Sequence, residues 1–174
     1  MSRAFTKEDD ALEAPIIPPR AALPAGMANY VTPRGLELLR SELEELESER
    51  AKAEANKDDA AERTRQITLL KGKISLLTQR ITSAKVIDPK EQPADEVRFG
   101  ATVSLKTISG GKPGMKRTFT IVGVDEASVE EGRIGFVAPI ARAVIGSKVG
   151  DKVALQMGRV QEIVEVVNIK YEGN

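Results

Sequence analysis

The 174-residue sequence contains no cysteine, no histidine and no tryptophan, and aromatic residues make up only 3% of it. Without cysteine no disulfide can form, and without histidine as well the usual zinc sites and the Ser-His and Cys-His nucleophiles are excluded. A metal would have to be a hard cation held by carboxylates. We expect no catalytic residue, no metal and no cofactor, and a protein that is not an enzyme.

Two further absences concern the surroundings of the chain. The 26 Lys and Arg residues balance 26 Asp and Glu residues, so the chain lacks the basic surplus of a broad nucleic-acid-binding surface. No apolar run approaches the roughly 18 residues of a membrane span, and no apolar signal segment opens the chain. We expect a cytoplasmic protein, most simply a monomer, with no membrane contact and with nucleic acid reached only through a partner.

Residues 1–29 are predicted to be a Pro-rich tail. Four prolines, Pro15, Pro18, Pro19 and Pro24, fall within ten residues. Because proline fixes φ and lacks an N–H, neither a helix nor a central strand is predicted there. The tail is interpreted either as a disordered solubilising arm or as a segment that folds onto a partner.

An antiparallel coiled-coil hairpin is predicted over residues 30–88. Thr32 can cap a helix whose first residue is Pro33. Mostly apolar residues then recur at alternating spacings of three and four, which is the 3.5-residue period of a coiled coil. The first run is Leu36, Leu39, Leu43, Leu46, Arg50 and Ala53, and the second is Ala60, Arg63, Ile67, Leu70, Ile74, Leu77, Ile81 and Ala84.

The break between the two runs lies at residues 56–59, and it is short enough to make the helices antiparallel. Residues 33–55 carry seven Glu against four Lys or Arg, whereas residues 63–85 carry six Lys or Arg and no acid, so the two helices complement each other. No third element is predicted to cover the outer faces of the hairpin, which favours an arm that reaches a partner.

The carboxylates at the turn are Asp58, Asp59 and Glu62. In one interpretation they approach a Mg²⁺ ion or basic residues of a partner. In the other they cap the second helix and favour the positive end of its dipole. The sequence leaves both interpretations open.

The remaining chain is predicted to be a linker over 89–96 and a domain over 97–174, a small antiparallel sheet with one short helix, so that the fold class is α+β. Runs rich in β-branched residues, separated by glycine turns, predict strands over 99–107, 116–124, 133–137, 152–157 and 160–171. Pro139 and Gly146 delimit the short helix. Its Ile140, Val144 and Ile145 are predicted to pack into the core.

Two motifs occur together in this domain: the run from Ile121 to Ala127 (IVGVDEA) and the run from Pro139 to Gly146 (PIARAVIG). With the heptad hairpin ahead of them, they resemble the bacterial Gre transcript-cleavage factors (GreA/GreB family) over about residues 30–172. The resemblance implies an FKBP-like C-terminal domain that docks at the rim of the RNA polymerase secondary channel while the hairpin enters the channel. It also implies that Pro139, Ile140 and Arg142 contact the polymerase.

The sequence departs from this family at the hairpin. The acidic Gly-Asp-x-x-Glu-Asn-Ala tip of the family is absent, and each helix is shorter by about one heptad, or roughly 10 Å at 1.5 Å per residue. The tip should then fall short of the catalytic metal of the polymerase, so we expect transcript cleavage to be stimulated weakly or not at all. Two alternatives stay open: an FKBP-like protein-binding module with a coiled-coil arm and no polymerase role, and a protein whose hairpin pairs with another coiled coil.

Overall fold

The computed structural model describes residues 14–172, and its contacts divide the chain into two units. Among these residues, the first unit contains 14–20 together with Leu39–Thr82, and the second contains Ala21–Leu38 and 83–172. The first part of the predicted tail, residues 1–13, lies outside the described residues. The predicted domain boundaries stay predictions, and the contacts add that the root of the hairpin belongs with the sheet.

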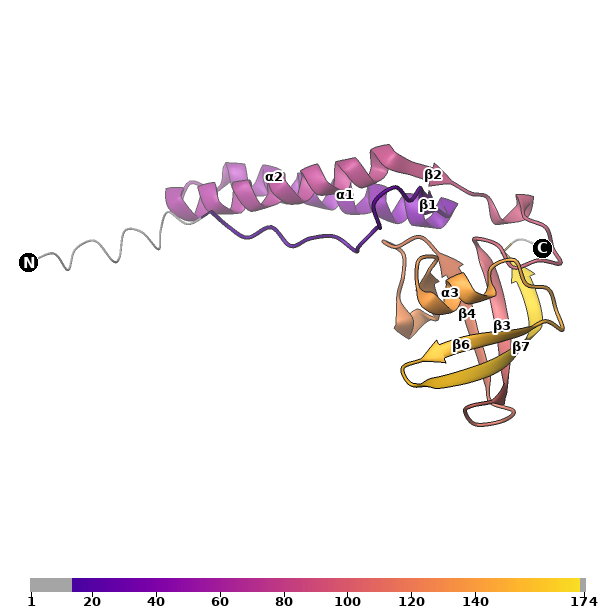
Figure 1. The fold of residues 1–174 in the computed structure, drawn as a ribbon. Coiled ribbons are helices and arrows are strands. Elements are labelled where there is room, and N and C mark those ends of the chain that lie inside the picture. The colour runs from indigo at the N-terminus through magenta and orange to yellow at the C-terminus, as the bar shows by residue number, and fades with distance from the viewer. Residues whose placement is uncertain (1–13, 173–174) are drawn as a thin grey trace, which may run out of the picture. The chain divides into compact units, whose positions relative to one another are not determined.

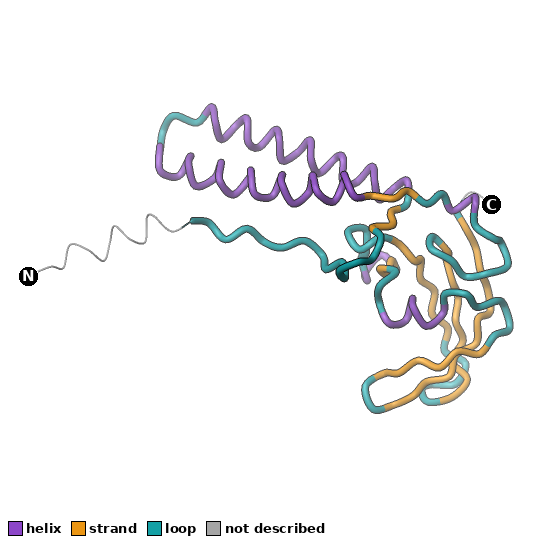
Figure 2. The backbone as a smooth tube through the Cα atoms, turned by 45° about the horizontal axis from the view of Figure 1, so that its top comes forward, coloured by secondary structure: helices purple, strands orange, loops and turns teal. Residues whose placement is uncertain are grey.

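Two long helices form the hairpin, α1 over Pro33–Ala55 and α2 over Ala60–Ser83, and they run side by side in opposite directions (Figures 1 and 2). The backbone N–H of Gly35 donates to Oγ1 of Thr32 at 2.9 Å, so Thr32 is the N-cap that the sequence predicts. Both predicted runs supply the seam, whose buried members are Leu39, Leu46 and Ala53 on α1 and Leu70 and Leu77 on α2.

The second part of the predicted tail, residues 14–28, begins with a segment that lies along the hairpin. Residues 14–20 run beside α2 (Figures 1 and 2), where Ile17 contacts Gly72 and Arg20 forms an ion pair with Glu42. As the prolines predict, residues 14–28 contain no helix and no strand. The expectation that nothing covers the outer faces of the hairpin is wrong on this side.

A pair of three-residue strands that the sequence did not reveal flanks the hairpin. Strand β1, Asn29–Val31, precedes α1 and pairs in parallel with β2, Ala84–Val86, which follows α2. The amide of Asn29 also donates to the hydroxyl of Ser83 at 3.2 Å. The two ends of the hairpin are thus joined by backbone hydrogen bonds, and the tail predicted through residue 29 ends where β1 begins.

The larger sheet has five strands in the order β5-β4-β3-β7-β6. The strands are β3 over Ala101–Ser109, β4 over Lys116–Val122, β5 over Arg133–Gly135, β6 over Lys152–Met157 and β7 over Val160–Tyr171. All neighbouring pairs are antiparallel except β4 with β5, which are parallel. With α3, Pro139–Val144, and the short 3₁₀ helices η1, Pro89–Glu91, and η2, Val129–Glu131, this is the predicted α+β class.

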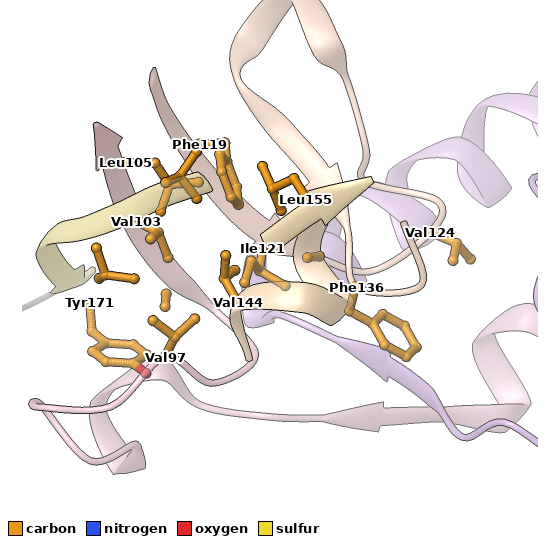
Figure 3. Close-up of a cluster of buried hydrophobic side chains, with 14 residues drawn as sticks. Val97, Val103, Leu105, Phe119, Ile121, Val124, Phe136, Val144, Leu155 and Tyr171 are labelled. Atoms are coloured by element: carbon orange, nitrogen blue, oxygen red, sulfur yellow. The ribbon is translucent and has the colours of Figure 1, made fainter. Parts of the chain in front are cut away.

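The core of this unit lies between the sheet and α3 (Figure 3). Side chains along β3 alternate between buried and half-exposed, as expected of a strand with one face on the core. Val103 and Leu105 of β3, Ile121 of β4 and Val144 of α3 are fully buried. Each such aliphatic side chain contributes about 1.5–3 kcal/mol relative to an exposed one, so the sheet unit has a continuous apolar core despite its few aromatics.

Candidate partner-binding surfaces

Three aromatic rings gather at one place in the sheet unit. Tyr30 of β1 lies 5.9 Å from Phe99 and 5.5 Å from Phe136, and Phe99 lies 5.6 Å from Phe136, measured between ring centroids. The rings meet at interplanar angles of 49° to 79°, close to the edge-to-face arrangement that aromatic pairs favour. They line a pocket of about 280 Å³, whose other walls are Ile87, Gln92, Arg98 and Ile145.

This pocket suits an apolar side chain of a partner. Phe136 is buried, Tyr30 and Phe99 are half-buried, and Ile145 keeps 37% of its surface exposed. Few polar atoms of the protein face the cavity. An apolar side chain that enters it would therefore displace water without leaving many polar groups of the pocket without hydrogen bonds. The backbone of β1 passes close to Gly123, since a Cβ atom built there would lie only 2.6 Å from the Tyr30 carbonyl oxygen.

The predicted docking residues lie on α3. Pro139 is its first residue and is exposed, Arg142 is exposed, and Ile140 is half-buried against the core. Val144 is fully buried as predicted. The prediction of a core position for Ile145 is wrong: the helix ends at Val144, so Ile145 turns outward to the aromatic pocket.

The turn of the hairpin uses its polar groups for local hydrogen bonds. Asp59 accepts the backbone N–H of Glu62 at 3.1 Å and thereby caps α2. The backbone N–H of Asp58 donates to the Asn56 side chain at 3.0 Å, and the Arg63 guanidinium donates to the Asn56 carbonyl at 2.9 Å. Asp58, Asp59 and Glu62 are all exposed, and within residues 14–172 no three such side chains gather as metal ligands.

A buried carboxylate at the root of the hairpin escaped the sequence reasoning. Glu126 has only 2% of its side chain exposed, and it accepts hydrogen bonds from Thr32 at 2.6 Å, Arg34 at 3.0 Å and Arg133 at 3.1 Å. A Cβ atom at residue 35 would lie 2.8 Å from Oε2 of Glu126, which explains the glycine in the first turn of α1. The carboxylate thus ties the N-cap of α1 to the sheet unit.

A second buried carboxylate ties two hairpins of the sheet together. Glu162 of β7 accepts hydrogen bonds from the Thr107 hydroxyl, at 2.7 Å, and from the Arg117 guanidinium. The hydrogen bonds from Thr107 and Arg117 hold the pKa of Glu162 below its ordinary value, although burial opposes them.

The C-terminal tyrosine of β7, Tyr171, is a further buried titratable group. Burial raises its pKa, and its hydroxyl donates to the Glu96 carbonyl and accepts from the Arg98 N–H.

The described part of the chain thus consists of a helical hairpin and a small α+β unit with an aromatic pocket beside a short helix. None of the helices in the described part of the chain is long and apolar enough to cross a membrane. The buried carboxylates of Glu126 and Glu162 accept hydrogen bonds from side chains within the sheet unit.

Comparison with known proteins gives the family. Residues 92–171 match the family model "Transcription elongation factor, GreA/GreB, C-term". The chain is 33% identical to GreB of Neisseria meningitidis (serogroup A) over 157 residues, covering 82% of this chain and 94% of that protein. It is 36% identical to GreA of Ralstonia nicotianae over 156 residues, covering 81% and 96%. The chain belongs to the GreA/GreB family of transcription elongation factors.

A solved structure of a GreA/GreB factor from Nitrosomonas europaea aligns with 82% of this chain and 98% of its own, at 20% identity and a TM-score of 0.40. The sequence alignments also carry a length difference. The alignment with N. meningitidis GreB spans 157 positions, whereas 82% of 174 residues is about 143, so about 14 positions have no counterpart in this chain.

Proposed function

We propose that this protein regulates transcript elongation by binding RNA polymerase at its secondary channel, with the sheet unit docked on the rim and the hairpin inserted. The observation that carries the proposal is the aromatic pocket bordered by Ile145, next to α3, in a chain with the GreA/GreB order of hairpin and sheet. The pocket offers a site for an apolar side chain of the polymerase. Exposed Arg142 offers a charge for an acidic neighbour.

We further propose that Pro139 and Ile140 shape this docking surface while Ile145 and Arg142 contact the partner directly. Pro139 sets the start of α3, and Ile140 packs its underside against the core. The residues that carry most of the binding energy in protein interfaces are enriched in arginine, tyrosine and tryptophan and cluster in well-packed, desolvated pockets. The docking surface that we propose therefore consists of Pro139, Ile140, Arg142 and Ile145.

The hairpin is proposed to stimulate transcript cleavage weakly or not at all. Asp59 already caps α2, so its carboxylate is engaged within the turn. The deficit of about 14 aligned positions matches the two heptads by which the hairpin is expected to be short, and seven residues fewer in each helix bring the tip back by about 10 Å. Displacement of catalytic groups by about 1 Å can already cost 100-fold in rate. Asp58 and Glu62 are left to meet basic channel residues.

In this function the protein is a monomeric, cytoplasmic regulator that catalyses no reaction of its own and holds no cofactor. It meets nucleic acid only through the polymerase, which agrees with the balance of 26 basic and 26 acidic residues. Its hairpin would occupy the channel in place of its longer relatives.

Binding to purified core RNA polymerase tests the proposal. Ile145→Asp and Arg142→Glu are each expected to weaken binding about tenfold, a loss typical of an interface anchor. The matched controls are Val129→Asp, at a position 89% exposed, and Arg159→Glu, on the exposed β6–β7 turn, and both should bind as the parent protein does. Equal binding by all four variants would remove the pocket from the interface, and absence of binding by the parent would end the proposal.

Cleavage is tested separately on backtracked elongation complexes at physiological Mg²⁺ concentration. We expect no shortened RNA beyond the amount that the polymerase produces alone. Shortened products that disappear in the triple variant Asp58→Asn, Asp59→Asn, Glu62→Gln would show instead that the tip takes part in metal chemistry.

The same pocket favours a second candidate function, an FKBP-like protein-binding module with a coiled-coil arm. Aromatic walls are what a proline-containing peptide needs, and Tyr30 adds a ring that the sheet region alone does not have. Turnover of a standard proline peptide, abolished by Ile145→Asp, would support this candidate. Recovery from cell extract of another coiled-coil protein without polymerase subunits would favour the third interpretation, a hairpin that pairs with a partner helix.

A further inference from the structure

A notch in α2 receives a side chain from the N-terminal segment. Gly72 lies in the middle of α2, where glycine is among the least favourable residues. A Cβ atom built on Gly72 would lie 1.9 Å from Cδ1 and 2.7 Å from Cγ1 of Ile17. Any side chain at position 72 would therefore displace Ile17, which explains why the helix carries a glycine there.

An ion pair fixes the same segment to the other helix. The guanidinium of Arg20 donates two hydrogen bonds to the carboxylate of Glu42, at 2.8 and 3.0 Å. This two-pronged geometry sets the orientation of the Arg20 side chain, which is 19% exposed. Ile17 and Arg20 thus hold residues 14–20, which we call the strap, on both α1 and α2.

The strap is built to dock on one side. Ile17 is half-buried at the notch, whereas its neighbour Ile16 is 90% exposed. Pro15, Pro18 and Pro19 restrict the backbone to extended conformations, which lowers the entropy lost on docking. The ion pair is partly exposed, and exposed pairs of this kind contribute little to stability, so a competing partner can displace the strap.

We propose that the strap is an autoinhibitory element: docked in the Gly72 notch, it adds a third layer to the hairpin and must leave before the hairpin enters a narrow channel. This inference rests on the proposed function for its consequence, because only insertion makes the added thickness matter. The docking itself needs no polymerase. If the strap is docked about 90% of the time, about one molecule in ten can insert, so releasing the strap should tighten the apparent affinity about tenfold.

The absence of cysteine makes the docking directly testable in the full chain. In Ile17→Cys/Gly72→Cys, the sulfur at residue 17 takes a γ position that lies within about 3 Å of the new Cβ, as a disulfide requires. The control Ile16→Cys/Gly72→Cys differs only in placing the thiol on the exposed neighbour. We expect the first pair to oxidise at least about tenfold faster, since docking raises the effective concentration of the thiols. Equal rates would overturn the docking.

Polymerase binding then tests the inhibitory role. The oxidised Ile17→Cys/Gly72→Cys protein should bind core polymerase at least about tenfold more weakly than the same protein after reduction. Gly72→Leu, which fills the notch with a good helix former, should bind about tenfold more tightly than the parent. Equal affinities for the oxidised and reduced proteins would overturn autoinhibition while leaving the proposed function intact. Absence of binding in every form would end the proposed function and the inhibitory role together, whereas fast cross-linking would still establish the docked strap.

Discussion

The buried carboxylate of Glu126 gives the sharpest stability prediction. It accepts hydrogen bonds from Thr32, Arg34 and Arg133, and only 2% of its side chain is exposed. In Glu126→Gln the charge is lost, and the amide NH₂ faces donors where an oxygen stood. Hydrogen bonds to charged groups contribute about 1.5–3 kcal/mol each, and breaking a buried pair costs about 3–5 kcal/mol. Since Arg34 is 40% exposed and glutamine keeps one acceptor, we expect a loss of about 2–4 kcal/mol.

The matched control is Glu131→Gln. Glu131 contacts the same two arginines, Arg34 at 3.8 Å and Arg133 at 3.4 Å, but its side chain is 59% exposed. An exposed pair of this kind contributes no more than about 1 kcal/mol, so this variant should be nearly as stable as the parent. The two substitutions remove the same charge from the same cluster and differ in burial.

Tyrosine fluorescence during urea denaturation measures the effect in the unit concerned, because both tyrosines, Tyr30 and Tyr171, belong to the sheet unit and the chain has no tryptophan. Surface substitutions usually change the free energy of unfolding by no more than roughly 0.5 kcal/mol. A change of that size or smaller in Glu126→Gln, or an equal loss in Glu131→Gln, would refute the assignment of Glu126 as the buried anchor of α1.

Two further predictions concern the seam and the sheet. Leu77→Ala should lower the free energy of unfolding of the hairpin by about 2–5 kcal/mol, because Leu77 is completely buried. The control Leu38→Ala, at a position 46% exposed, should cost much less. Helical circular dichroism during urea denaturation measures both variants. Because the pKa of Glu162 is lowered in the folded state, its contribution to stability is present above the ordinary carboxyl pKa and is lost as the pH falls through the lowered one. The free energy of unfolding should therefore drop with pH from about 5 downward, and Glu162→Gln should flatten that slope; an unchanged slope would contradict the role of Glu162.

The hairpin could be predicted from the sequence because its determinants are local. The spacing of Leu39, Leu46, Leu70 and Leu77 defines the seam, and Thr32 with Pro33 marks the start. The longer strands were equally visible: β6 and β7 have the predicted bounds, and β3 begins two residues later than predicted.

What the sequence did not reveal depends on contacts between distant residues. Strands β1 and β2 have three residues each, too few for an alternating pattern, and they pair across the whole hairpin. Strand β5 lies within the strand predicted over 133–137, but its parallel pairing with β4 was not predicted. The aromatic pocket combines Tyr30 with rings about 70 and 106 positions further along the chain, Phe99 and Phe136, so no local motif announces it.

The strap left a signal that could have been used. Glycine in the middle of a heptad helix costs about 1 kcal/mol relative to alanine, and such a residue has a reason. At Gly72 the reason is Ile17, 55 positions earlier in the chain. The structure gives the positions of the predicted docking and tip residues. Their roles stay predictions, which the binding and cleavage experiments test.

The use of acidic side chains connects these findings to function. Glu126 and Glu162 are buried and committed to arginine and threonine partners, and Asp59 caps α2. Carboxylates engaged in this way cannot also bind a metal and a water molecule without giving up the fold's own hydrogen bonds. The binding surfaces that we propose are the aromatic pocket, the exposed Arg142 and the hairpin, and the strap covers part of α2 at Gly72. The regulation that we propose therefore depends on whether the strap or the wall of the polymerase channel occupies the space along α2.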